Sequence, residues 1–486
     1  MKQESTENLQ EKSSLNRLAV KAGIFYIFAQ LLVRGITFLT TPVYTRLLSQ
    51  EQYADIRLFE SWLLIAVPTL SLCLWKSVDR AKYDTGEHYN EYVSASQTLS
   101  YLSIGTVFLL CLIFKRQVQS ALELNDLMFY MAFLYIFAYT SILFLQRREK
   151  QMMRYKVSTL VTALTVIPAT FLSILLIWLG RRNGDLDQLV NLRVIGFYTP
   201  HIIGGAAIAI ILWLQGKHLV NLKYWKYGLL YSIPLIPEAI SIQIMNQADK
   251  IMVRYMVSKT AASIISLATT VSFIIWILED SVWNAWLPWL FEKISRGEEQ
   301  DVEKPWTFIM HGFGLISWFL VLLAPEVVAI LGPKEYRAAI YLSAPMIVGT
   351  LFRFFSYIYS AVENYYKKTG YVAATTVITM IINMILNYFF ILRFGYIAAA
   401  YTTAASYFIL LLLQSWCEYR ITGTLLVPVK KTALISLSYF VLCCLSMLLY
   451  SVPFYFRYAV LITGVLIAAK FLLPQLLAIL KTLRKK

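Results

Sequence analysis

Two arginines lie inside long apolar stretches of this chain, where a charge is costly. Arg34 falls in QLLVRGITFLTTP, and Arg353 falls in TLFRFFSY. An ionisable side chain at the centre of a membrane-spanning helix costs at least ~2.5 kcal/mol, and it normally faces a cavity or a partner. We therefore expect each guanidinium group either to face an internal cavity or to form an internal salt bridge. The chemistry available to such residues is the binding of charged groups within a membrane.

Three acids also fall within apolar sequence. Glu238 lies in SIPLIPEAISIQIMNQADK, close to Pro234 and Pro237. Proline in a spanning helix breaks backbone hydrogen bonds that must be satisfied nearby, so this segment suits a gate or an ion site. The alternative is a kink whose acid pairs with an arginine. Glu279 and Asp280 follow Trp276 and precede Trp283, and they are either internal acids or residues of a membrane interface.

A second group of charges is expected at the outer ends of the helices. Asp249, Lys250 and Arg254 form a cluster there, and together with Arg46 they are candidates for an external gate. The alternative for this cluster is an interfacial set of salt bridges. Glu60 is expected to lie close enough to the outer surface to be simply solvated.

The composition explains why these charges stand out. The 486 residues are 58% hydrophobic and 15% charged, with a mean hydropathy of +0.60, whereas a soluble protein carries about 25% charged residues. A transmembrane helix needs about 20 apolar residues, and fourteen such stretches are found. Their approximate limits are 21–47, 55–76, 92–114, 127–146, 157–179, 194–215, 227–248, 262–290, 305–331, 338–361, 371–392, 395–417, 432–451 and 457–480. The predicted fold class is an all-α polytopic membrane protein.

The basic residues predict the orientation of these spans. With the N-terminus in the cytoplasm, 27 of the 44 Lys and Arg residues fall on the cytoplasmic side, 14 fall outside, and Arg34, Arg353 and Lys470 fall within spans. Lys and Arg are enriched in cytoplasmic loops, so both termini are predicted inside. The same bias explains the net charge of +16 without a nucleic-acid partner. The outer loops are short, the five cysteines fit packing positions, and no metal-binding spacing occurs.

Internal similarity predicts two lobes. RLLSQEQYADI (46–56) resembles RYMVSKTAASI (254–264), and the segment 156–176 resembles 371–391. Transporters are often built from such repeats, with a substrate path between them. The predicted organisation is a cytoplasmic segment over 1–20, an N-lobe over 21–215, a C-lobe over 216–425, and two further helices with a basic end over 426–486.

Three motifs resemble one family. They are TPVYTRLLSQEQYADIRLFES (41–61), SIPLIPEAISIQIMNQADKIMVRYMV (232–257) and INMILNYFFILRFGYIAAAYTTAASY (382–407). Their order and spacing are similar to those of Wzx-type polysaccharide-unit flippases of the multidrug/oligosaccharidyl-lipid/polysaccharide exporter superfamily. One departure is SLCLWKSVDRAKYD at the end of span 2, where the family has a Gly-rich Leu-Gly-Leu stretch.

The resemblance implies two six-helix lobes in a V shape and a cargo of undecaprenyl-diphosphate-linked oligosaccharide, moved to the outer leaflet of the bacterial plasma membrane. Arginine binds phosphate oxygens two at a time, so Arg34 and Arg353 are the expected diphosphate ligands. Ion-coupled alternating access is expected, with Glu238 as the first coupling candidate and Asp280 as the second. The implied partners are membrane lipids and the polysaccharide polymerase machinery.

Other functions of the same architecture stay open. A lipid II flippase resembles this chain in layout, and so does a multidrug cation antiporter, although an antiporter should have an acid-rich cavity. A polysaccharide polymerase is an enzyme of similar size and hydrophobicity, but it would need a long outer loop for its catalytic residues. The chain has no G-x-x-x-x-G-K-[ST] phosphate loop. We therefore expect a transporter without enzymatic activity, cofactor or metal.

Overall fold

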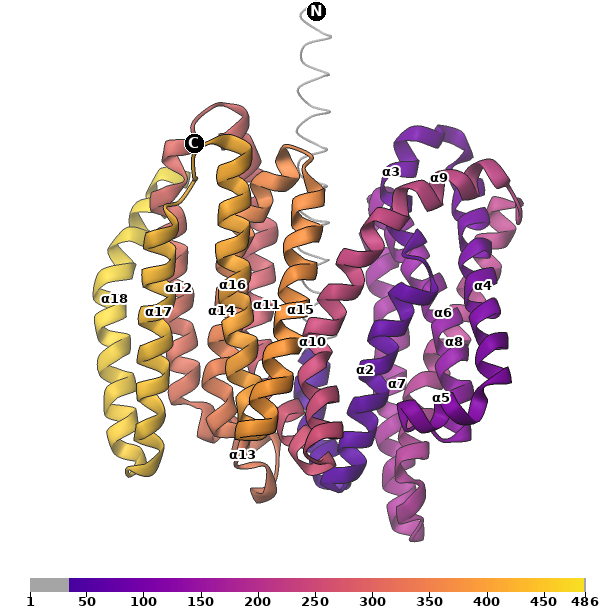
Figure 1. The fold of residues 1–486 in the computed structure, drawn as a ribbon, viewed down its shortest axis with the longest axis horizontal. Coiled ribbons are helices and arrows are strands. Elements are labelled where there is room, and N and C mark those ends of the chain that lie inside the picture. Colours follow the sequence, from indigo (N-terminus) through magenta and orange to yellow (C-terminus); the bar gives the residue numbers. More distant parts are fainter. Residues whose placement is uncertain (1–34, 485–486) are drawn as a thin grey trace, which may run out of the picture. The chain divides into compact units, whose positions relative to one another are not determined.

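The computed structural model describes residues 35–484, and this part of the chain consists of helices and their connections, with no strand (Figure 1). Eleven helical segments within it are long and apolar enough to cross a membrane, and each overlaps at least one predicted span. In a bilayer every backbone polar group must be satisfied within the segment, which helices achieve. The predicted all-α polytopic class is confirmed, while the count of fourteen spans stays approximate.

The chain divides into two compact units, Met1–Gln247 and Ala248–Lys486, which we call unit 1 and unit 2. In the described part of unit 1, residues 35–47 are helical. The helices that follow are α2 (Gln50–Leu70), α3 (Leu74–Thr85), α4 (Tyr89–Ile113), α5 (Lys115–Leu122), α6 (Asp126–Gln151), α7 (Tyr155–Asn183), α8 (Leu189–Gly216), α9 (Leu222–Ser232) and α10 (Ile236–Met256), which continues into unit 2. The predicted lobe boundaries at 215 and 425 stay predictions.

Helix α8 packs closely on its neighbours in unit 1 because small residues line its contacts. A Cβ atom added to Gly196 would lie 2.5 Å from Cα of Ser173 on α7. A Cβ added to Gly205 would lie 2.3 Å from the carbonyl oxygen of Ala138 on α6. Small residues let helix backbones approach closely in membranes, so these two glycines set the spacing of α6, α7 and α8.

The second span ends earlier than predicted. Helix α2 ends at Leu70. In the turn that follows, Leu72 and Cys73 have positive φ values of +54° and +50°. Left-handed backbone favours glycine, so the missing Gly-rich stretch is replaced here by two ordinary residues in that conformation. The chain then starts α3, where Asp79 accepts hydrogen bonds from Arg147 (2.8 Å) and Gln151 (2.9 Å) on α6.

Unit 2 contains the remaining helices. They are α11 (Lys259–Ser295), α12 (Glu303–Leu322), α13 (Ala324–Leu331), α14 (Ala339–Tyr365), α15 (Thr369–Phe394), α16 (Ile397–Thr422), α17 (Val429–Ser446) and α18 (Phe454–Arg484). The prediction of one continuous span over 305–331 is wrong, because α12 ends at Leu322 and a separate helix, α13, begins at Ala324. Pro325 explains the break, since proline lacks an N–H and its ring clashes with the preceding helical turn.

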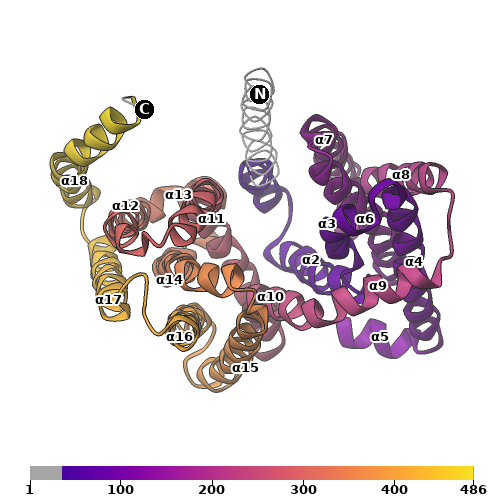
Figure 2. The ribbon, with the colours of Figure 1, turned by 90° about the horizontal axis from the view of Figure 1, so that it is seen from above.

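Helix α14 forms the centre of unit 2. It packs against α11, α12, α15, α16 and α17, and its neighbour α16 lies beside it when the unit is seen from above (Figure 2). Helices α17 and α18 pack on α12, with Trp318 donating a 2.8 Å hydrogen bond to Ser446. Lys431 on α17 also pairs with Glu303 on α12 at 2.7 Å. The two C-terminal helices are therefore an integral part of unit 2.

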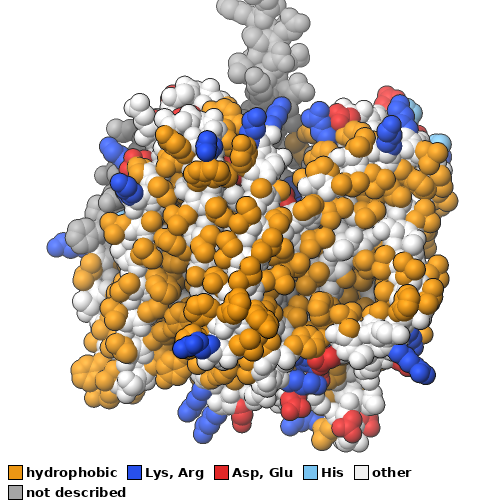
Figure 3. Space-filling model, viewed as in Figure 1, with side chains coloured by type: hydrophobic (Ala, Val, Ile, Leu, Met, Phe, Trp, Pro, Cys, Tyr) orange, Lys and Arg blue, Asp and Glu red, His pale blue; other side chains and the backbone are white. Residues whose placement is uncertain are grey.

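The surface of each unit matches a membrane environment. On the face shown in Figure 3, hydrophobic side chains cover the middle of both units, while basic and acidic side chains gather towards the helix ends. Large apolar side chains such as Leu109, Leu164 and Phe389 are more than half exposed. Apolar patches of this extent mark contact with lipid or a partner, which fits the eleven apolar spans.

Candidate functional site

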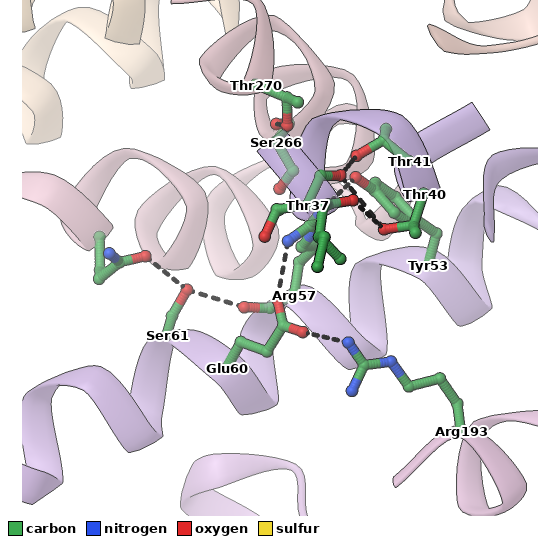
Figure 4. Close-up of polar contacts among 12 residues, drawn as sticks. Thr37, Thr40, Thr41, Tyr53, Arg57, Glu60, Ser61, Arg193, Ser266 and Thr270 are labelled. Carbon is green, nitrogen blue, oxygen red and sulfur yellow. Dashed lines mark hydrogen bonds and ion pairs between the residues drawn. The ribbon is translucent and has the colours of Figure 1, made fainter. Parts of the chain in front are cut away.

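Unit 1 holds a largely buried charge cluster on α2 and α8, formed by the half-buried Arg57 and Glu60 and the buried Arg193 (Figure 4). Nη1 of Arg57 donates to Oε2 of Glu60 at 2.8 Å, and Nη2 of Arg193 donates to Oε1 at 2.6 Å. A second nitrogen of Arg57 donates to the Tyr53 hydroxyl at 2.7 Å. Two guanidinium groups share one carboxylate, so the cluster has a net positive charge inside the unit.

Arg193 keeps unused hydrogen-bonding capacity. Its side chain is 5% exposed, and its Nε and Nη1 atoms are buried without a well-formed hydrogen bond to any residue between 35 and 484. The guanidinium lies 4.1 Å from the ring centroid of Phe197 and 5.2 Å from that of Tyr44. A buried donor without an acceptor is costly. These N–H groups can therefore receive the oxygen atoms of an anionic ligand.

The sequence reasoning missed this cluster. Arg57 and Arg193 were assigned to the outer side, and Glu60 was expected to be solvated, but α2 and α8 bury all three to a large degree. Arg57 and Arg193 are therefore further arginines of the helical segments, beside the predicted Arg34 and Arg353. The available signal was the i, i+3 spacing of Arg57 and Glu60, which places both on one helix face.

In unit 2, Arg353 pairs with an acid of its own unit. Nη2 of Arg353 on α14 donates to Oε2 of Glu279 on α11 at 3.4 Å, and the guanidinium lies 4.2 Å from the ring centroid of Trp276. Glu279 is fully buried, and Arg353 is 8% exposed. Nε of Arg353 lacks a hydrogen-bond partner among the described residues. Asp280, next to Glu279, is half-buried.

A third polar cluster surrounds Asp249. This carboxylate on α10 accepts a 2.8 Å hydrogen bond from Asn387 on α15, and it lies within 2.8 Å of the Thr403 hydroxyl on α16. Asn383 and Thr402 extend the network, with Asn383 donating to Thr403 at 3.2 Å and Thr402 hydrogen-bonding to Asn387. In the described chain no Lys, Arg or His forms an ion pair with Asp249, so this buried acid is held by neutral donors alone.

Of the four residues of the predicted external gate, Arg46 and Asp249 have hydrogen bonds within their own units. Arg46 donates to the carbonyl oxygen of Pro42 in its own helix at 2.9 Å, and Asp249 bonds to α15 and α16. Arg254 is buried, and Lys250 is half-buried. The proposed gating role of these four residues stays a prediction.

Two further predicted site residues are Glu238 and Arg34. Glu238 lies in the first turn of α10, directly after a short 3₁₀ helix over Ile233–Leu235, so the span is interrupted near its two prolines as predicted. Its half-buried side chain makes no hydrogen bond or ion pair with the described residues. Arg34 lies outside the described residues. The diphosphate role of Arg34 and Arg353, and the coupling role of Glu238 and Asp280, stay predictions.

Comparisons with known proteins agree on one family and one fold. A family model described as "Polysaccharide biosynthesis protein" matches residues 19–294, more than half of the chain. A protein of the Lsg locus of Haemophilus influenzae is 20% identical over 377 residues, covering 74% of this chain and 88% of that one. The "Probable low-salt glycan biosynthesis flippase Agl15" of Haloferax volcanii is 22% identical over 410 residues, with 81% of each chain covered.

Solved structures show the same fold at low sequence identity. The lipid II flippase MurJ in an inward closed conformation superposes with a TM-score of 0.68 at 17% identity, covering 94% of this chain and 100% of that one. An inward-facing multidrug resistance transporter of the MATE family, from the MOP superfamily, gives a TM-score of 0.62 at 13% identity, covering 84% and 99%. The described helices therefore have the fold of this transporter superfamily.

Proposed function

Because the chain belongs to the polysaccharide biosynthesis protein family, we propose that it is a flippase that moves a lipid-linked oligosaccharide between membrane leaflets. The observation that carries the proposal is the buried Arg57–Glu60–Arg193 cluster, whose net positive charge and unused donors suit an anionic head group. Fold similarity to a lipid flippase and a drug exporter supports transport as the activity.

The cargo is an undecaprenyl-diphosphate-linked repeat unit, and its diphosphate is the part that needs basic ligands. Charge-assisted hydrogen bonds to phosphate oxygens are roughly twice as strong as neutral ones. Arg193 presents two nitrogen atoms, and Arg353 presents one, that have no hydrogen-bond partner among residues 35–484. Arg34 is a further candidate on the N-terminal span. The glycan crosses in a polar environment, while the lipid tail stays in the hydrocarbon layer.

Direction and location follow from the charge bias of the loops. The cytoplasmic side carries most Lys and Arg residues, so we place both termini in the cytoplasm of a bacterial cell and the protein in its plasma membrane. The cargo is loaded from the inner leaflet and released in the outer leaflet. A surface polysaccharide polymerase would then use the released unit, which makes that machinery the expected partner.

Ion coupling is the second part of the proposal. Glu238 and Asp280 were the expected sites, but Asp249 has the stronger geometry because it is buried and forms no ion pair with a described basic residue. Its carboxylate, the amide oxygens of Asn383 and Asn387, and the hydroxyls of Thr402 and Thr403 lie in one network that contains several oxygen ligands for a small cation. A proton or sodium ion bound there would compensate the charge of the carboxylate.

The experiment that tests the function is an analysis of polyprenyl lipids in a deletion strain, with the leaflet of each lipid determined. We expect an undecaprenyl-diphosphate oligosaccharide to accumulate on the cytoplasmic side, with loss of surface polymer. The wild-type gene and Arg296→Ala, an exposed control, should restore export, whereas Arg193→Ala should not. Single exported units without polymer would indicate a polymerase instead, and an unchanged lipid pool would indicate drug export.

A further inference from the structure

Two glutamates in unit 2 are buried and form no ion pair with a described residue. Glu363 is on α14 and is 0% exposed, and both of its carboxylate oxygens lack a hydrogen-bond partner in the described part of the chain. Glu418 is on α16 and is 1% exposed. One of its oxygens accepts the backbone N–H of Leu426 at 2.7 Å, and the other lacks a partner among the described residues. Neither acid forms an ion pair there.

The two acids lie at the same ends of two packed helices. Helices α14 and α16 pack against one another, and Glu363 and Glu418 are both near the C-terminal ends of these helices. The other titratable groups near them are Tyr359 on the same face of α14, Cys417 on α16 and Glu299 in the connection before α12. Tyr359 donates to Thr432 on α17 at 2.8 Å. None of these three groups is basic. The basic residues nearest along the chain are Lys367 and Lys368 after α14 and Arg420 on α16, and none of them forms an ion pair with either acid in the described structure.

Helix geometry further disfavours two negative charges at this position. Glu363 lies in the last turn of α14, which ends at Tyr365, and Glu418 lies near the end of α16, which ends at Thr422. The C-terminal end of a helix carries partial negative charge and favours cations. Burial without pairing is costly for a carboxylate, which normally becomes neutral instead. Gln414, one turn before Glu418, adds another buried oxygen without a described partner.

We propose that Glu363 and Glu418 form a buried proton-binding site at the end of α14 and α16. One carboxylate takes up a proton from water, which forms an O–H bond and cancels one charge. The site faces the side that the basic loops assign to the cytoplasm, so protons reach it from there. Any part in the transport cycle rests on the proposed flippase function.

A stability measurement tests the site independently of transport. The full-length protein in detergent is melted from about pH 5 to about pH 8. If the folded pair keeps a proton that the unfolded carboxyls release, stability falls as pH rises, with the unfolding equilibrium changing by up to about tenfold per pH unit for one proton. Glu363→Gln and Glu418→Gln mimic the neutral acid, so each should fold and flatten this dependence.

A control variant comes from another acid of unit 2. Glu303→Gln removes an exposed acid paired with Lys431 in the same unit and should leave the slope unchanged. An equal slope in wild type and both Gln variants overturns the proposal. The proposal is also overturned if the melting temperature responds to sodium at constant pH and ionic strength but not to pH, because the ligand is then a metal cation. If the variants do not fold, the infrared band of a protonated carboxyl in the wild type decides, and its absence at neutral pH overturns the site.

Export measured in the deletion strain separates the site from the function. If the Glu363→Gln variant exports at the wild-type rate but its export no longer depends on cytoplasmic pH, the proton takes part in the transport cycle. Absence of glycolipid export in every variant, including wild type, overturns the flippase function while the melting result still stands for the proton site.

Discussion

Nη2 of Arg193 donates a 2.6 Å hydrogen bond to Oε1 of Glu60, so that α8 and α2 share a buried charge pair within unit 1. The second oxygen of Glu60 is already used by Arg57 at 2.8 Å. One carboxylate therefore neutralises only one of these two guanidinium groups, and the remaining positive charge is the basis of the proposed binding of an anionic head group.

Removing the shared carboxylate should destabilise unit 1. Glu60→Gln leaves two guanidinium groups without a countercharge, and breaking a buried ion pair costs about 3–5 kcal/mol. Because the Glu60 side chain is 20% exposed, we expect a smaller cost than for a fully buried pair, about 2–3 kcal/mol, measured as a lower melting temperature of the purified protein. Glu292→Gln, which removes an exposed partner of Arg296, is the matched control. A melting temperature equal to that of the control would contradict the structural role of Glu60.

Arg353 should be needed for transport as well as for folding. Charged hydrogen bonds contribute about 1.5–3 kcal/mol, so loss of a phosphate contact in Arg353→Ala should reduce export by about tenfold or more. The same change leaves Glu279 buried without its partner. The double variant Arg353→Met with Glu279→Gln removes both charges and should recover expression but not export. Normal export by both Arg34→Ala and Arg353→Ala at wild-type expression would remove these arginines from the diphosphate site.

Asp249 should determine the response to ion gradients. Asp249→Asn preserves the size of the side chain but removes the negative charge that would bind a proton or sodium ion. We expect export by this variant to become insensitive to collapse of the proton and sodium gradients, which should inhibit the wild type. Asp301→Asn, an exposed acid paired with Lys293, should behave like the wild type. Wild-type export that persists after both gradients are collapsed would eliminate ion coupling.

The close packing of α8 predicts a steric effect. Gly196→Val places side-chain atoms against the backbone of α7, where even a Cβ would lie 2.5 Å from Ser173. Overpacking typically costs about 1–3 kcal/mol, so the protein should melt at a lower temperature and express poorly. Gly312→Val is the control, because a Cβ there has nothing within 4 Å. Equal melting temperatures for the two variants would contradict this account of helix spacing.

The sequence alone determined the membrane class and most of the helix positions. Apolar runs of about 20 residues can satisfy their backbone groups in a bilayer only as helices, so hydropathy was sufficient to find the eleven spans that the described chain contains. The interruption before α10 was also predictable, because Pro234 and Pro237 act on the local backbone. Pro325 was equally local, but its effect was missed because the apolar run continues across it.

Only the tertiary structure decided which charged residues act together. Glu60 meets Arg193 across 133 positions of sequence, and Asp249 meets Thr403 across 154. Pairings of this kind depend on which helix faces touch, and a hydropathy pattern contains no information about the rotation of one apolar helix against another. For the same reason, Glu363 and Glu418 look like ordinary residues at helix ends in the sequence, and their burial without an ion pair to any described residue becomes visible only when α14 packs against α16.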